Sequence, residues 1–526
     1  MSKSEKSAVI STHRDSVSVI HPTNGTAQVK KRFNFWTAFS VAVCTSGAWE
    51  GWTASIAQGI AGGGSVGLVW GWVFVSVGIT CMACALAEFV SMWPSAGGQY
   101  VWSANLAPPK YSRILSWTTA WFGLAGLWLA ALSCGIGVAV QIQSYVIVNR
   151  EYEPKTWHAF VICIACMFCW IIVNIFAVKT LHYMNMTILV LHVVGYFVVI
   201  GILTGFTEEK HDAKYIFTHF QNSTGWDSDF VSWSIGLLAA LYAYLSIDTA
   251  IHFSEEIPRA NVLVPRAMVL QAGSTALMTF PFIVVAILCI GDIDAVLGSP
   301  IGLMSPFTQI LINSTGNVPL STFLNCISTT VAMAAGFDLW GAASRAIWSM
   351  ARDNALPPAM AKLHPRWGVP VLANLILIVP SIAVFLIYIW NTTAFYGIMA
   401  GVLVAFQLSY VVPLGINIFY TAWWKKDLVK GPFNMGKFAL PVHIIGFLFG
   451  CFMVLFMSFP VNSPVNATNM NYAATILGAV FILSMVLWVF YGRKHYYGPL
   501  EFAATEPMSM SVEGEVTSDS KNGDWV

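Results

Sequence analysis

The sequence predicts an all-helical polytopic membrane protein with about twelve transmembrane helices. Apolar residues make up 57% of its 526 residues, charged residues only 10%, and the mean hydropathy is +0.67. Soluble proteins carry about 25% charged residues, and here the apolar residues stand in runs long enough to cross a bilayer. The net charge of +1 gives no basic surface for nucleic acid. These figures exclude soluble enzymes, secreted disulfide scaffolds and nucleic-acid binders.

Twelve apolar segments follow one another along the chain, and each is long enough for a span of about 20 residues. The expected spans are residues 34–60, 67–92, 114–147, 157–178, 184–206, 231–257, 267–290, 320–350, 371–390, 394–420, 439–459 and 473–491. The transporter domain is therefore expected over 34–492, between polar tails at 1–33 and 493–526. We expect no cleavable signal peptide, because the first apolar run is too long for one.

The distribution of Lys and Arg orients these spans. The expected outer loops hold only four of the 26: Arg150, Lys155, Lys210 and Lys214. Because cytoplasmic loops carry the excess of positive charge, both tails are expected in the cytoplasm. Four sequons fall in loops that this topology places outside, and they are candidate glycosylation sites: Asn222, Asn313, Asn391 and Asn466.

The cysteines predict no metal site. Cys163, Cys166 and Cys169 have a spacing that metal sites also use, but they lie in an apolar run without a nearby His or acidic ligand. Small polarizable packing residues are the simpler interpretation. We expect neither a metal nor a cofactor.

Two spans carry polar and ionisable residues at mid-depth. A charged residue near the bilayer centre costs about 2.5–3.5 kcal/mol on insertion scales and usually faces a cavity. In span 34–60 these positions are Thr45, Ser46, Gly47 and Glu50; in span 231–257 they are Ser246, Ile247 and Asp248. Both helices are expected to break there. The alternative is that the hydroxyls bond back to the preceding turn and the helices stay intact.

The two expected breaks occupy matching places in two sets of five helices. The first set covers 34–206 and the second 231–420, and a long connection follows the second helix of each set, on opposite sides of the membrane. An inverted-topology repeat would give this pattern, and its broken helices mark a transport site at the midplane. Two extra helices follow in 439–491.

Several runs resemble motifs of a known superfamily. They are Pro-Ser-Ala-Gly-Gly-Gln-Tyr at 94–100, His-Phe-Ser-Glu-Glu at 252–256, Val-Pro-Arg-Ala at 264–267, Ser-Arg at 344–345 and Ala-Arg-Asp-Asn-Ala-Leu-Pro at 351–357. They resemble the amino acid–polyamine–organocation superfamily, and with Trp-Glu-Gly at 49–51 they look most like its fungal amino acid, choline and GABA permease branch. The resemblance covers about residues 34–491. The glycine expected beside the acid of the sixth helix is absent, since Ser-Ile-Asp-Thr stands at 246–249.

The resemblance implies a secondary active transporter and not an enzyme. Its substrate would be a small amine or amino acid such as choline or GABA, moved by alternating access and bound at the breaks of the first and sixth helices. The same resemblance favours the plasma membrane, with vacuolar or other endomembranes as open alternatives.

A broken helix leaves unpaired N–H groups that attract a carboxylate and unpaired carbonyls that attract an ammonium. The backbone candidates for substrate binding are Thr45, Ser46, Gly47, Ser246, Ile247 and Asp248. The acids Glu50 and Asp248 favour a cation, for which aromatic faces would form a cage. Cage candidates are Trp49, Trp52, Tyr242, Tyr244 and Trp340, with ordinary packing as the alternative for each.

A proton is the expected coupling ion, because His192 lies at mid-depth and imidazole titrates near neutrality. Glu50 and Asp338 are further proton candidates. Sodium remains an alternative, with possible oxygen ligands at Ser328, Thr329 and Thr330. Glu255 and Glu256 lie near the cytoplasmic end together with Arg345 and Arg352. These four are candidates for an inner gate, with a solvated surface as the alternative.

Two rival functions remain open at this point. A transporter-like nutrient receptor would bind its ligand in the same cavity. An intramembrane hydrolase is suggested by Gly-Gly-Ser-Val-Gly at 63–67, which matches the G-x-S-x-G pattern. That run lies between two apolar spans, without the strand that the hydrolase pattern requires. The sequence makes no prediction of oligomeric state.

Overall fold

Long apolar helices dominate the computed structural model, which describes residues 33–499 except 300, 303, 391–393, 423–427, 429 and 468. The first expected repeat contains α1 (Phe35–Ser46), α2 (Ala48–Met92), α3 (Gln99–Leu106), α4 (Pro109–Asn149), α5 (Thr156–Phe176) and α6 (Leu181–Phe206). A short helix α7 (Ala213–Thr218) follows. No strand occurs among these described residues.

The second expected repeat begins with several short helices. It contains α8 (Asp229–Gly236), α9 (Leu238–Tyr242), α10 (Thr249–His252), η1 (Ser254–Glu256), α11 (Ala260–Leu288), α12 (Ile293–Gly298), α13 (Pro306–Thr315), α14 (Val318–Arg352), η2 (Pro358–Ala361), α15 (Val371–Leu375), α16 (Ile378–Trp390), α17 (Ala394–Ile416) and η3 (Asn417–Ala422). The last part contains η4 (Gly436–Phe438), α18 (Ala439–Phe456), α19 (Ala473–Leu487), η5 (Trp488–Gly492) and α20 (Arg493–His495).

Ten helices of the described chain are long and apolar enough to cross a membrane, where twelve spans were expected. The difference has a structural cause. The 58-residue stretch Phe35–Met92 covers two expected spans, 34–60 and 67–92. The expected span 231–257 is divided among α8, α9, α10 and η1, none of which is long enough to be one of the ten.

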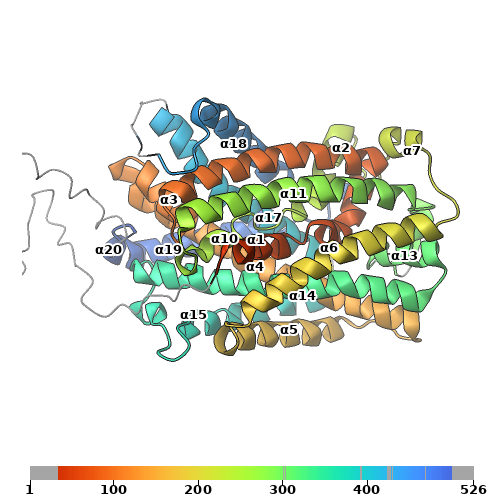
Figure 1. Ribbon diagram of the computed structural model, residues 1–526, viewed down its shortest axis with the longest axis horizontal. Helices are drawn as coiled ribbons and strands as arrows, with labels where there is room; N and C mark the ends of the chain where they lie inside the picture. The colour runs from red at the N-terminus through yellow and green to blue at the C-terminus, as the bar shows by residue number, and fades with distance from the viewer. Residues whose placement is uncertain are drawn as a thin grey trace, which may run out of the picture. The chain divides into compact units, whose positions relative to one another are not determined.

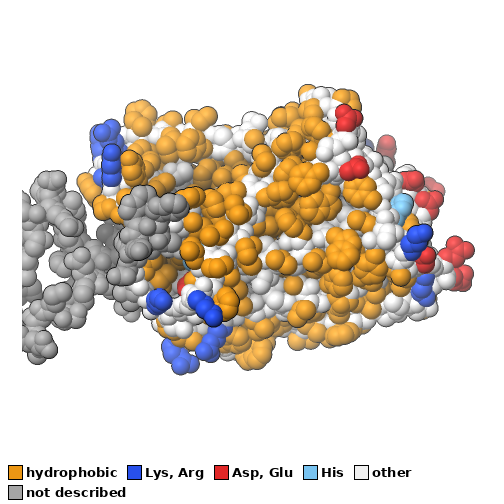
Figure 2. All heavy atoms as spheres, turned by 90° about the horizontal axis from the view of Figure 1, so that it is seen from above, with side chains coloured by type: hydrophobic (Ala, Val, Ile, Leu, Met, Phe, Trp, Pro, Cys, Tyr) orange, Lys and Arg blue, Asp and Glu red, His pale blue; other side chains and the backbone are white. Residues whose placement is uncertain are grey.

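The long helices lie side by side along one direction (Figure 1). We call the end where α3, α15 and α20 lie the tail end, because both described chain ends lie there, and the end where α7 and α13 lie the far end. Hydrophobic side chains cover the middle of the face seen in Figure 2, while Lys and Arg gather at the tail end and most Asp and Glu at the far end. Apolar side chains exposed over the middle are expected of a protein surrounded by lipid.

Two glycines set the course of the first helical stretch. Gly47 ends α1 in the left-handed conformation, with φ 53° and ψ 31°. Gly64 has φ 59° and ψ −150° and separates the expected spans 34–60 and 67–92 within α2. A side chain at Gly64 would also approach the backbone nitrogen of Gln221 to 3.0 Å. Only glycine adopts that backbone region without strain.

The second break contains no glycine. Residues 243–248 form turns between α9 and α10, and Ser246 adopts a positive φ of 53°. The Ser246 hydroxyl donates to the Asp248 carboxylate at 2.9 Å and lies 2.6 Å from the Thr249 hydroxyl. These contacts of its hydroxyl group hold Ser246 in this conformation. The helix is therefore interrupted where the resemblance would have placed a glycine.

Helices α2 and α8 approach closely at Gly62, and we expect Gly62→Leu to destabilise the fold. A Cβ at Gly62 would lie 2.6 Å from the Cα of Gly236 and 2.7 Å from the carbonyl oxygen of Ser232. Because both neighbours are backbone atoms, the helices must separate, at a cost of about 3 kcal/mol. Thermal unfolding of the detergent-purified protein would measure it. Gly273→Leu on α11 is the control, since nothing lies within 4 Å of its Cβ position; equal losses in both variants would contradict the prediction.

Candidate functional site

A pocket of about 480 Å³, its open mouth included, lies at the break between α1 and α2. The break contributes Thr45, Ser46, Gly47, Glu50, Gly51 and Ala54. The other walls are Ser133, Cys134, Gly137 and Gln141 of α4, Tyr242 and Leu245 near the second break, Ser328, Val331, Ala332 and Ala335 of α14, and Phe395 of α17.

The first turn of α2 leaves backbone donors unpaired. Gly47 N–H still donates to Val43 O, and Gly51 N–H donates to Gly47 O at 2.5 Å. Among the described residues, no hydrogen bond runs from the N–H groups of Ala48 and Trp49 back to α1. Such a helix N-terminus carries partial positive charge and favours an anionic group.

Thr45 and Ser46 line the pocket, but their hydroxyls donate within α1. Thr45 donates to Val41 O at 2.6 Å and Ser46 to Val43 O at 2.9 Å. The back-bonding expected of an intact helix is therefore present, and the break falls one residue later, at Gly47. The hydroxyl oxygens retain lone pairs that can accept from an ammonium group.

Glu50 and His192 form a buried pair at the pocket. The Nδ1 of His192 on α6 lies 2.9 Å from both carboxylate oxygens of Glu50, and the two side chains are 1% and 3% exposed. Glu50 is the only carboxylate among the described residues that line the pocket. The neighbouring Trp49 faces away from it: its indole N–H donates to His192 O, and its ring packs on Phe282 with centroids 5.0 Å apart.

Asp248 lies at the second break and does not line this pocket. It is fully buried and accepts three hydrogen bonds. The donors are Gln99 Nε2 at 2.5 Å, the Tyr410 hydroxyl at 2.8 Å and the Ser246 hydroxyl at 2.9 Å, and His252 Nε2 lies 3.4 Å from the same carboxylate. A carboxylate satisfied in this way holds the break together and leaves little capacity for a ligand. Ser246 and Ile247 likewise lie outside the lining.

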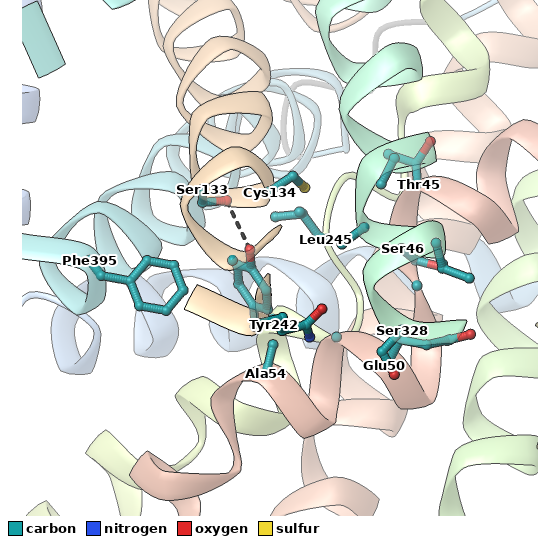
Figure 3. A pocket seen from close by; sticks show the side chains of 17 residues that line it. Thr45, Ser46, Glu50, Ala54, Ser133, Cys134, Tyr242, Leu245, Ser328 and Phe395 are labelled. Carbon is teal, nitrogen blue, oxygen red and sulfur yellow. Dashed lines mark hydrogen bonds between the residues drawn. The ribbon is translucent and has the colours of Figure 1, made fainter. Parts of the chain in front are cut away.

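The aromatic side chains do not form a cage around the pocket. Figure 3 shows Tyr242 and Phe395 on one side and Thr45, Ser46 and Glu50 on the other; the Tyr242 hydroxyl lies 2.9 Å from the Ser133 hydroxyl. The other expected cage residues pack elsewhere: Trp52 against Phe282, Tyr244 on Trp72 with its hydroxyl donating to Ser76, and Trp340 against Trp170.

Residues of α4 and Phe395 line the pocket, and neither was predicted from the sequence. Ser133, Gly137 and Gln141 lie on one face of α4, at spacings of four residues. Gln141 is a polar residue within an apolar run, which was the available signal. Phe395 gave none, because it is one aromatic residue among many in apolar spans.

The four inner-gate candidates form two ion pairs at the tail end. Arg345 Nε donates to Glu256 at 2.6 Å, and Arg352 Nη1 donates to Glu255 at 2.9 Å. The first pair is buried and the second about one-fifth exposed. The Arg345 guanidinium also lies 4.2 Å from the ring centre of Phe253. α14 runs from the far end to the tail end, so Ala335 in the pocket precedes Arg345 by ten residues, about 15 Å.

Asp338 lies apart from the pocket in a buried position. Its Oδ1 accepts from Asn185 at 2.9 Å, and its Oδ2 has no hydrogen-bond partner among the described residues. Of the possible sodium ligands, Ser328 lines the pocket, whereas the Thr329 hydroxyl donates to Gln141 and the Thr330 hydroxyl to Cys326 O. The sequons at Asn313 and Asn466 are exposed and Asn222 is half-buried; Asn391 lies outside the described residues.

Comparison with known proteins finds one matching family and several similar relatives. Residues 33–482 match the model of a family described as amino acid permease. The chain is 29% identical over 510 residues to a choline transporter of Saccharomyces cerevisiae, covering 95% of this chain and 88% of that protein. It is 31% identical over 440 residues to a putative amino acid/polyamine transporter of Macrophomina phaseolina, covering 83% and 96%. It is also 25% identical over 505 residues to a GABA-specific permease of Saccharomyces cerevisiae, covering 93% and 86%.

Proposed function

Because the chain belongs to the amino acid permease family, we propose that it carries a small ammonium compound, such as choline, GABA or an amino acid, by alternating access. Members of this family are transporters and not enzymes, which excludes the hydrolase interpretation of residues 63–67. The Ser65 hydroxyl has another role, since it donates to the backbone carbonyls of Tyr215 and His219.

The pocket at the first break, with Glu50 in its wall, carries this proposal. The carboxylate attracts an ammonium group, the hydroxyl oxygens of Thr45 and Ser46 can accept from it, and the unpaired N–H groups after Gly47 suit a carboxylate at its other end. We propose that the buried ion pair of Arg345 and Glu256, about ten residues along α14 from the pocket, is the closed gate at the tail end. Alternating access requires such a gate on one side of the site.

The remaining predicted site residues have supporting roles in this proposal. Ser246, Ile247 and Asp248 fix the second break beside Leu245 and Tyr242 of the pocket. Trp49, Tyr244 and Trp340 pack on Phe282, Trp72 and Trp170 and do not line the pocket. We assign them a role in supporting the fold around it.

Uptake in cells that lack their own permeases tests the function. Labelled choline, GABA and arginine would be offered singly and in competition, and saturable accumulation of one of them supports a carrier. Binding without uptake would favour a nutrient receptor, and flux that does not saturate would favour a channel. Saturation by neutral amino acids alone would contradict the preference for a cationic amine.

We further propose that the pair of Glu50 and His192 carries a coupling proton, and we expect His192→Gln to lower accumulation at least tenfold at pH 5. Glutamine keeps a hydrogen-bonding group but cannot be protonated, so uptake would no longer rise as external pH falls. Uptake measured between pH 5 and 8, with sodium present or replaced by potassium, checks this.

His443→Gln is the matched control for that prediction. His443 pairs with Glu88 at 3.0 Å near the tail end, outside the pocket. A His192→Gln variant that keeps wild-type pH dependence would end the proton role of His192, and loss of wild-type uptake without sodium would favour sodium coupling.

We propose that the tail end faces the cytoplasm and that the protein resides in the plasma membrane. The concentration of Lys and Arg at the tail end supports this orientation. The sequons Asn222, Asn313, Asn391 and Asn466 would then be glycosylated on the outer side. A glycosidase that leaves the electrophoretic mobility of the expressed protein unchanged would contradict the glycosylation.

A further inference from the structure

A second pocket, of about 310 Å³ with its opening included, lies at the tail end. Its walls include Glu255 and Glu256 of η1, Arg345 and Trp348 of α14, and the segment 368–370. That segment is held in place by backbone bonds, from His364 N–H to Val369 O and from Gly368 N–H to His364 O. This pocket shares no lining residue with the one at the first break.

An unpartnered carboxylate oxygen belongs to this pocket. Glu256 is 3% exposed, and its Oε1 accepts from Arg345 Nε at 2.6 Å. Its Oε2 is buried and has no hydrogen-bond partner among the described residues. Because buried carboxylate oxygens normally have a donor, such an atom calls for an explanation. An ammonium group in the pocket would supply the missing donor.

One unpartnered oxygen and one aromatic ring favour a cation in this pocket. Glu256 and Glu255 are each paired with an arginine, Arg345 and Arg352, so the attraction comes from the buried Oε2 of Glu256, which has no partner among the described residues. The Arg352 guanidinium lies 4.8 Å from the Trp348 ring centre, which shows that this ring accepts a positive group. A small amine can donate to Oε2, whereas an anion would be repelled by it.

The Arg345–Glu256 pair links this pocket to the closure of the tail end. The same residues join α14 to the start of α1, since Phe33 N–H donates to Glu256 O at 3.1 Å and the rings of Phe33 and Phe253 are 5.5 Å apart. A cation that binds Glu256 competes with Arg345 for its carboxylate. Its arrival would loosen the contact that holds the tail end closed.

Resting on the transport function proposed above, we propose that this pocket is a release-side subsite for the ammonium group of the transported compound. Glu256 receives that group, Trp348 flanks it, and its competition with Arg345 promotes opening of the tail end.

Exchange measured from both sides of the membrane tests the subsite. The probe is whichever of choline, GABA and arginine wild-type cells accumulate most. Cells are preloaded with increasing amounts of it unlabelled, and the stimulation of labelled uptake is recorded. For Glu256→Gln and Trp348→Leu we expect a larger change on the inside than on the outside. The fold increase in the internal concentration that gives half-maximal stimulation should be at least five times the fold increase in the external KM. Glu88→Gln, which removes a buried carboxylate outside this pocket, is the matched control.

Two results would overturn the subsite: equal changes in the internal and external constants of the two variants, or the same asymmetry in Glu88→Gln. If neither variant reaches the membrane, Leu363→Trp replaces them, because Leu363 lines the pocket and a larger side chain there narrows it without removing either partner of the ion pair. An unchanged internal constant in that variant also overturns the subsite. If wild-type cells accumulate none of the three compounds, the proposed transport function is contradicted. That outcome differs from the two above, which require a wild-type protein that transports.

Discussion

Glu50→Gln is expected to lower the kcat/KM of uptake by about 100-fold. Glu50 is the only carboxylate among the described lining residues of the main pocket, and its substitution leaves His192 without its charged partner. Buried hydrogen bonds to charged groups contribute about 1.5–3 kcal/mol, and 1.4 kcal/mol corresponds to about tenfold. Initial rates of labelled choline, GABA and arginine uptake, corrected for the amount of protein at the membrane, measure the loss.

Two further variants make this expectation specific to the pocket. Glu50→Asp keeps the charge and shortens the side chain, so it should retain more uptake than Glu50→Gln. Glu88→Gln removes another buried carboxylate, paired with His443, and should have an effect below threefold. If Glu50→Gln transports as well as Glu88→Gln, the main pocket is not where the ammonium group binds.

The first break could be predicted from sequence, whereas the geometry of the second could not. At Gly47 a glycine stands beside hydroxyls and an acid, and this glycine adopts the left-handed conformation that ends α1. At the second break Ser246 adopts a similar φ. A serine in this conformation depends on partners such as Asp248 and Thr249, which the chain provides only once it is folded. The amino-acid composition of the segment therefore gives too weak a signal to predict a helix break of this kind.

The direction in which a side chain points could not be predicted from the sequence. Trp49 and Glu50 are neighbours in sequence, yet Glu50 lines the pocket and Trp49 packs on Phe282. Adjacent helical positions point about 100° apart, and the bundle interior is apolar on most helix faces, so no stripe of polarity identifies the cavity. Tyr244 and Trp340 were assigned to a cage for this reason and pack elsewhere.

Partners distant in sequence decide what an intramembrane acid does. Asp248 was expected to face the substrate because an unpaired charge at mid-depth is costly. In the fold, Gln99 and Tyr410 donate to it from segments about 150 residues away on either side. Their contact with Asp248 is tertiary, and no local spacing reveals it. The two ion pairs at the tail end were easier to predict from the sequence. Glu255 and Glu256 carry charges opposite to those of Arg345 and Arg352, and all four residues were expected at the same depth.

The second large effect is expected from Arg345→Met at the tail end. Arg345 and Glu256 form a buried pair at 2.6 Å, and removing one partner of such a pair costs about 3–5 kcal/mol, since the other charge stays buried alone. We expect a lower melting temperature of the detergent-purified protein and uptake reduced at least tenfold, because the closed tail end loses its main ionic contact. Thermal unfolding and labelled uptake measure the two effects.

The pairing itself is tested by adding Glu256→Gln to Arg345→Met. The double variant leaves no uncompensated charge, so it should recover most of the lost stability, because a buried pair is often replaceable as a unit. Arg352→Met is the comparison within the same gate. Its pair with Glu255 is about one-fifth exposed, and pairs near solvent contribute only about 0–1 kcal/mol. If Arg345→Met and Arg352→Met destabilise equally, or if Glu256→Gln adds to the loss, then the closure of the tail end does not depend on the buried pair.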